Sequence, residues 1–195
     1  QMCIRDSNVA GDNIILEAAS GGIGAPGSAM RVSPTASSSL IARAAGDIWV
    51  EAPVNLTVDT IFSRNNVNLD VTGSILDMPG DSLTTPAVNI RSNNVTLRSR
   101  TGSIGRDDNP LDLGVNPDGR IDARSDAVGQ GIFLNGPSGE RFNVGASTSG
   151  GATVLSAAEE VKVDGTVTGL GTISLVSGGK TVSYTHLRAH ETSLH

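Results

Sequence analysis

Two stretches of the chain decide its fold: residues 14–24 read IILEAASGGIG, and residues 95–105 read VTLRSRTGSIG. At one constant offset, Leu16 aligns with Leu97 and the closing Gly-x-Ile-Gly aligns with its counterpart; we call this offset the long repeat. A third, partial copy lies between them. Asn-Asn-Val-Asn-Leu at 65–69 resembles Asn-Asn-Val-Thr-Leu at 93–97. Thr-Gly-Ser-Ile at 72–75 recurs at 101–104 at nearly the same offset, and we call this offset the short repeat. Such repeats predict a solenoid.

The repeats are built from short runs in which apolar residues alternate with other residues. These runs lie at 14–16, 48–50, 56–58, 67–71, 88–90, 95–97, 111–113, 132–134, 142–144, 161–163 and 173–175. Alternation with period two is the pattern of a β-strand that buries one face. Clusters of Gly, Asn, Asp, Ser and Pro separate the runs and predict turns. Helical periodicity is poor, so the sequence predicts an all-β protein.

Short strands with frequent turns are compatible with a parallel β-helix and, as the alternative, with a β-sandwich. The repeats favour the parallel β-helix, because equivalent strands then stack from coil to coil. We expect a single domain with right-handed winding, as strand twist favours for parallel crossovers. In this arrangement Leu16, Leu69 and Leu97 form an apolar ladder, and the recurring asparagine pairs form hydrogen-bonded ladders at the corners.

Composition narrows the classes of protein further. The 195 residues include 24 glycines and only 3% aromatic residues, which disfavours a globule of packed helices. The net charge of −6 without a basic stripe argues against a nucleic-acid partner. No apolar run approaches the length of about 18 residues that a membrane span needs.

The two ends of the sequence do not follow the repeat. One codon choice for residues 2–7 (MCIRDS), read as its reverse complement, encodes residues 181–186 (TVSYTH). This relation resembles read-through of a sequencing adapter, so we interpret residues 1–7 and 182–195 as non-native tails. The β-helix then occupies residues 8–181 as a fragment of a longer repeat protein. We expect the tails to lie exposed or loosely docked, with Tyr184 and Leu187 outside the core.

Excluding the tails removes most of the usual catalytic side chains. The single cysteine, all three histidines and the single tyrosine lie within them. The remaining body therefore lacks the residues for Ser-His-Asp or Cys-His catalysis and for the common zinc sites. Disulfides are absent from it as well, so stability must come from stacking and repeated hydrogen bonding.

The block Gly-(Ser/Gly)-Ile-Gly-x4-(Pro/Ala)-(Leu/Met)-x-(Val/Leu), at 21–32 and 102–113, resembles repeats of bacterial filamentous haemagglutinin-type adhesins. The run Asp-Ile-Trp-Val-Glu-Ala at 47–52 resembles them too, and the likeness covers most of residues 8–181. The resemblance implies a non-catalytic β-helical shaft of a large secreted or surface-exposed bacterial protein. It also implies export through an outer-membrane transporter. A host-cell or glycan surface is a further partner that the sequence leaves unassigned.

The alternative function is a polysaccharide lyase or hydrolase on a β-helix scaffold. Such an enzyme needs carboxylates, or a carboxylate with a basic residue, that converge on one groove. Asp112, Asp122 and Arg120 or Arg124 are the best candidates, although no spacing requires them. We therefore assign no catalytic residue.

Three further patterns suggest ligands, and we interpret each structurally. Residues 22–27 match G-x-G-x-x-G, but prolines and serines break the helix that should follow, so we expect a β-helix corner and no cofactor. Gly179-Lys180-Thr181 resembles only the end of a phosphate loop. A group of oxygen-bearing side chains offers a calcium site, for which solvated turns are the favoured interpretation: Asp107, Asp108, Asn109, Asp118, Asp122 and Asp126. We predict no metal.

The aromatic residues offer a carbohydrate-stacking platform as a possible role. The four residues concerned are Trp49, Phe62, Phe133 and Phe142. Three of them lie in alternating strand runs, and for these three we expect packing in the core.

Overall fold

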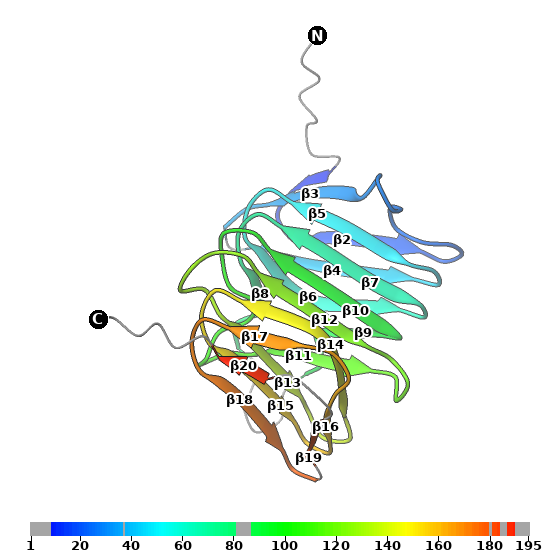
Figure 1. Ribbon diagram of the computed structural model, residues 1–195. Coiled ribbons are helices and arrows are strands. Elements are labelled where there is room, and N and C mark those ends of the chain that lie inside the picture. The colour runs from blue at the N-terminus through cyan, green and yellow to red at the C-terminus, as the bar shows by residue number, and fades with distance from the viewer. Residues whose placement is uncertain (1–8, 37, 81–86, 180, 184–186, 190–195) are drawn as a thin grey trace.

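The chain folds as a parallel β-solenoid of about 8 turns, which confirms the predicted parallel β-helix. The computed structural model describes residues 9–36, 38–80, 87–179, 181–183 and 187–189. Figure 1 shows the strands stacked in sequence order along one axis, from blue at the N-terminal end to red at the C-terminal end. All pairings between the described strands are parallel, which excludes the antiparallel β-sandwich.

The coils contribute strands to two sheets. The 11-stranded sheet contains β1 (Val9–Gly11), β3 (Met30–Pro34), β5 (Ile48–Ala52), β7 (Asn66–Val71), β10 (Asn94–Ser99), β12 (Ile121–Ser125), β14 (Phe142–Ser149), β16 (Val161–Val163), β17 (Val167–Gly169), β19 (Thr181–Ser183) and β20 (Leu187–Ala189). The 9-stranded sheet contains β2 (Ile14–Ala18), β4 (Ser39–Ala44), β6 (Leu56–Ser63), β8 (Ile75–Asp77), β9 (Ile90–Ser92), β11 (Leu111–Val115), β13 (Ile132–Gly136), β15 (Thr153–Ala157) and β18 (Ile173–Ser177). The described residues include no helix, and hence none that is long and apolar enough to cross a membrane.

The core consists of apolar ladders between the two sheets. Alternate residues of each strand point inward, and residues in register on successive coils stack on one another. One ladder of the 11-stranded sheet is formed by Ile48, Val67, Val95, Ile121, Val144 and Val163, which are at most 1% exposed. Each coil therefore packs its apolar residues against those of its neighbours, which is how a solenoid obtains a continuous core.

Hydrogen-bonded side chains line one corner of the solenoid, as predicted from the asparagine pairs. Asn66 Nδ2 donates to Asp47 Oδ1 at 2.9 Å, and Asn94 Nδ2 donates to Asn66 Oδ1 at 2.7 Å. The Arg120 backbone N–H then donates to Asn94 Oδ1 at 2.9 Å. The number of residues between successive members of this ladder differs from coil to coil. Coils of different length therefore place a hydrogen-bonding side chain at the same corner.

The structure distinguishes the short repeat from the long repeat. The short repeat is a true step between neighbouring coils, because Leu69 and Leu97 are register partners. The long repeat is not a coil-to-coil step. Leu16 lies in β2 of the 9-stranded sheet with Ala42 as its partner, whereas Leu97 lies in β10 of the 11-stranded sheet. The predicted ladder is therefore correct for Leu69 and Leu97 and wrong for Leu16.

A buried amide bridges the point where the 9-stranded sheet divides. β6 pairs with β8 through its first half and with β9 through its second half. The Asn89 side chain, 1% exposed, donates to Asp77 and to the Val58 carbonyl at 3.3 Å, and it accepts from the Asp112 N–H at 2.8 Å. Asn89 thus replaces the peptide groups that a continuous strand would supply, which keeps buried polar atoms paired.

The C-terminal segment differs in part from the sequence-based expectation. Ser183 belongs to β19, which pairs with β16, and Leu187–Ala189 form β20, which pairs with β17. We expected this tail to lie exposed or loosely docked, and at these positions it is docked by parallel strand pairing at the end of the solenoid. The last coil offers unpaired backbone groups at its edge, to which an extended segment adds readily. The adapter-like origin of the segment rests on its sequence and stays a prediction. Residues 1–7, Tyr184 and the side chain of Leu187 lie outside the described part of the chain.

Candidate functional site

The outward face of the 11-stranded sheet carries a ladder of charged and polar residues. Each is the register partner of the next: Arg31, Glu51, Asp70, Arg98, Arg124, Thr148, Thr168 and Arg188. The ladder changes character along the solenoid. Its first part alternates in small groups between basic and acidic residues, and its later part carries two threonines before it ends at Arg188.

Ion pairs tie the charged part of this face together across the coils. Arg100 donates to both oxygens of Asp70 at 2.8 and 2.6 Å. Arg98 donates to Asp126 Oδ2 through Nε and Nη2 at 3.0 and 2.8 Å, and Arg124 donates to Asp126 Oδ1. The pKa of the Arg100 guanidinium is raised by its hydrogen bond to Asp70. In these pairs, each charged side chain is neutralised by a partner on the same face.

Asp126 is a carboxylate on this face whose pKa is lowered by two arginines. Partial burial acts to raise the pKa of Asp126, but the hydrogen bonds from Arg124 and Arg98 outweigh it and hold the pKa below its ordinary value of 3.8. Asp126 is therefore ionised near neutral pH, with an arginine on each oxygen. A carboxylate held in this way is poorly suited to take or give a proton near neutral pH.

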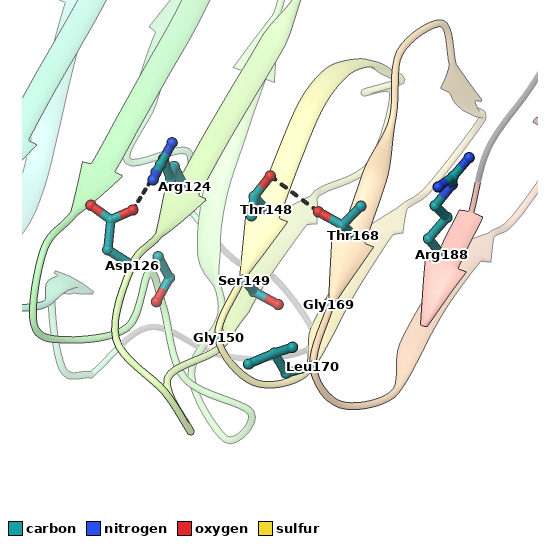
Figure 2. Close-up of a pocket in the computed structure, with 10 residues that line it drawn as sticks. Arg124, Asp126, Thr148, Ser149, Gly150, Thr168, Gly169, Leu170 and Arg188 are labelled. Carbon is teal, nitrogen blue, oxygen red and sulfur yellow. Dashed lines mark hydrogen bonds and ion pairs between the residues drawn. The ribbon is translucent and has the colours of Figure 1, made fainter. Parts of the chain in front are cut away.

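A groove of about 610 Å³ opens beside Asp126. It is lined by Arg124, Ser125, Asp126, Thr148, Ser149, Gly150, Thr168, Gly169, Leu170 and Arg188. Figure 2 shows Arg124 and Arg188 at opposite ends, with the two threonines between them. The hydroxyls of Thr148 and Thr168 lie 3.1 Å apart, and Leu170 is 49% exposed. The groove thus offers hydroxyls, an apolar edge and the Arg124 guanidinium to a ligand that lies along the solenoid, while Arg188 belongs to the segment that we interpret as a non-native tail.

The structure brings Asp122 and Arg120 together but separates Asp112 from them. Asp112 lies in β11 of the 9-stranded sheet and is 3% exposed, where its Oδ1 accepts from Asn135 at 2.6 Å. Asp122 lies on the outward face of the 11-stranded sheet, paired with Arg120 at 3.0 Å. The hydrogen bond to Asp122 raises the pKa of Arg120. Although Asp112 and Asp122 are close in sequence, they belong to two different sheets, and the pair does not form a site.

The oxygen-rich group proposed for calcium is dispersed as well. Asp108 pairs with Arg106 at 3.2 Å, and Asp122 and Asp126 are each bound to arginines. Within the described ranges there is no group of three or more His, Cys, Asp or Glu residues that could hold a metal ion. Asp107, Asp108, Asn109 and Asp118 lie in turns or bends, as the sequence favoured, whereas Asp122 lies in β12 and is paired with an arginine.

The G-x-G-x-x-G match is a corner of the solenoid. Ile23 forms an isolated parallel bridge with Ile48, and Gly24 and Gly27 adopt positive φ values of 67° and 74°. The chain then turns back through reciprocal hydrogen bonds between Ala25 and Ser28 and enters β3. No helix follows this segment, so the physical basis for dinucleotide binding is missing. Lys180, from the other phosphate-loop match, lies outside the described residues.

The four aromatic residues do not share a platform. Phe142 is in the core at 1% exposure, as predicted. Trp49 and Phe133 are half-buried and alternate with core residues, so the prediction that they lie in the core is wrong. Phe62, on β6, is 39% exposed on the outward face of the 9-stranded sheet. Trp49 and Phe133 occupy the positions between inward apolar residues, so the alternation itself places them on the outer face, whereas Phe142 occupies an inward position.

The fold and surface define a parallel β-solenoid with polar outward ladders. Comparisons with known protein families, with curated proteins and with solved structures find no match to this chain.

Proposed function

We propose that this chain forms part of the non-catalytic structural shaft of a large secreted or surface-exposed bacterial filamentous adhesin. The observation that carries the proposal is the pairing of outward charges across coils. Arg98 with Asp126, Arg100 with Asp70, and Arg141 with Glu159 each join different coils of the stack. A surface that satisfies its own charges suits a spacer more than a reaction centre.

The regular stacking of the coils also supports a shaft. Each coil contacts mainly its neighbours, so a solenoid of this kind extends by adding coils without a change in architecture. Its resemblance to haemagglutinin-type repeats supports export through an outer-membrane transporter and placement at the cell surface. A host-cell or glycan surface is the partner that this role implies, and repeated weak contacts along a shaft add through multivalency.

The direct test is to display the full chain on inert beads and to measure both glycan attachment and glycan breakdown. We expect no depolymerisation of polygalacturonate or alginate, with or without attachment. Saturable depolymerisation that Asp122→Ala or Arg124→Gln abolishes would contradict the proposal. Sequencing of the surrounding gene supplies the second test, because a shaft predicts further repeats of the same type and a transporter gene nearby.

A further inference from the structure

An exposed aromatic ring stands among arginines on the outward face of the 9-stranded sheet. Phe62 has Arg43 as its register partner on β4 and Arg91 as its partner on β9. Arg64 follows two positions later along the chain and is exposed. Ile61 and Ser63 are buried, so Phe62 and Arg64 both face outward. Adjacent strands lie about 4.8 Å apart, so Arg43, Phe62 and Arg91 line up over about 10 Å of the surface.

A hollow of about 260 Å³ lies beside this ring. It is lined by Glu17, Ala18, Ala19, Arg43, Ala44, Ala45, Phe62 and Arg64. The four alanines provide methyl and backbone surface. The Phe62 ring adds an aromatic face, the two guanidiniums add hydrogen-bond donors, and the carboxylate adds an acceptor. The volume lies just below the roughly 300–1,000 Å³ of pockets that hold a whole small molecule. The hollow therefore fits one ring of a longer ligand.

The guanidiniums of the hollow are available to an anion. Arg64 makes no ion pair within the described part of the chain, unlike most of the other arginines there. Arg43 faces Glu17 at 3.7 Å, with both side chains about 60% exposed, so that pair is weak. Arg91 is held more firmly by Glu140 at 2.8 Å.

We propose that this hollow binds a uronic-acid residue of an acidic glycan. The apolar face of the sugar ring packs on Phe62 and the alanine surface, where ring C–H groups meet the negative face of the aromatic ring. The sugar carboxylate accepts hydrogen bonds from Arg64 and Arg43, whose planar guanidiniums match a carboxylate. Glu17 accepts hydrogen bonds from sugar hydroxyls.

The topology favours a glycan over an acidic peptide. β4, β6 and β9 are each paired on both sides within the sheet, so this face offers no free backbone groups to an added strand. Recognition must therefore come from side chains alone, and a sugar ring with one apolar face, one carboxylate and several hydroxyls matches them. The proposal extends the adhesive role proposed above and rests on it for its biological meaning.

Titration of the full chain with trigalacturonate, followed by NMR of the protein, tests the site. Phe62→Ser and Arg64→Gln should each weaken binding about fivefold or more, as loss of one exposed contact does. Arg100→Gln makes the same charge change on the other sheet and should leave the affinity unchanged. The neutral trimer galactotriose should bind at least about fivefold more weakly than trigalacturonate.

Several results would overturn the assignment: no saturable binding, equal binding of galactotriose, or equal weakening by Arg64→Gln and Arg100→Gln. Binding of tetraglutamate as tight as that of trigalacturonate, unaffected by Phe62→Ser, would identify a nonspecific anion surface instead. Thermal melts of each variant keep the comparison valid, since Arg64 is exposed and its replacement should not unfold the chain. Failure here would leave the shaft proposal standing, because that proposal is tested by turnover and by the neighbouring gene sequence.

Discussion

The two copies of the Gly-x-Ile-Gly block form the same local structure in different sheets. In the first copy, Trp49 N–H donates to Ile23 O at 2.7 Å, and Gly24 turns the chain with φ of 67°. In the second copy, Phe133 N–H donates to Ile104 O at 2.7 Å, and Gly105 turns the chain with φ of 65°. Yet the first block leads into β3 of the 11-stranded sheet and the second into β11 of the 9-stranded sheet.

Local sequence therefore determines the strand and its kink but not the sheet to which they belong. Both sheets offer the same environment, with an apolar interior on one side and solvent on the other. A block that fits one sheet therefore fits the other. For this reason, two copies related by the long repeat can lie in different sheets, and the long repeat need not span a whole number of coils.

The largest expected effect separates the two aligned leucines. Leu97→Ala should lower the free energy of unfolding by about 2–5 kcal/mol, because Leu97 is 1% exposed between Leu69 and Ala123. Leu16→Ala should cost less than half as much, since Leu16 is only partly buried on the outermost strand of its sheet. Chemical denaturation measures both. Equal losses would contradict the different placement of the two copies.

The next effect tests whether the two kinks are equivalent. A Cβ at Gly24 would lie 2.4 Å from Trp49 O, and a Cβ at Gly105 would lie 2.2 Å from Phe133 O. Gly24→Ala and Gly105→Ala should each cost at least about 2 kcal/mol, which combines the left-handed backbone penalty with the steric clash. Chemical denaturation of the two variants measures the loss.

Gly27→Ala is the matched control for these kinks. Gly27 also has positive φ, at 74°, but a Cβ there meets nothing within 4 Å. Its replacement should cost only the conformational part, about 1–2 kcal/mol. If Gly105→Ala were tolerated while Gly24→Ala was not, the structural equivalence of the two blocks would be wrong.

How far the sequence predicts this molecule depends on the range of the interaction. The strands at 67–71 and 95–97 and the short repeat that relates them follow from alternation and repetition, both of which are local. The sheet of Leu16 does not follow, because both sheets carry the same alternation. Asp112 and Asp122 were candidates for one site for the same reason: spacing along the chain does not say that β11 and β12 belong to different sheets.

The surface sites depend on register and are predicted least well. Phe62 meets Arg43 and Arg91 only because coils of unequal length bring them into line. The arginines on Asp126 likewise come from different coils. The signal that remained in the sequence was Phe62 itself, an aromatic residue between Ile61 and Ser63 and outside the strand runs recognised from alternation.

The smallest expected effect concerns the ion pairs that distinguish the charged part of the outer ladder from its threonine part. Asp126→Asn should lower stability at pH 7 by about 1 kcal/mol or less, because these pairs lie near the surface. The folded chain lowers the pKa of Asp126, so its contribution is present above the ordinary value of 3.8 and is lost as the pH falls toward the lower folded value.

Denaturation of the wild type and of Asp126→Asn at pH 7 and at pH 3 checks the sign. The difference between the two proteins should shrink at pH 3. A difference that grew on acidification would show that Asp126 is not stabilised as a carboxylate in the folded chain.

Cysteine cross-linking tests the parallel stacking of coils with the two blocks in different sheets. Asn68 and Thr96 are outward-facing register partners on neighbouring coils, so a disulfide between cysteines there is within reach. Ile15 aligns with Thr96 in the long repeat but lies in the other sheet. In a Cys3→Ser background, Asn68→Cys/Thr96→Cys should form an intramolecular disulfide rapidly, and Ile15→Cys/Thr96→Cys should not. A disulfide in the second pair and none in the first would contradict the account.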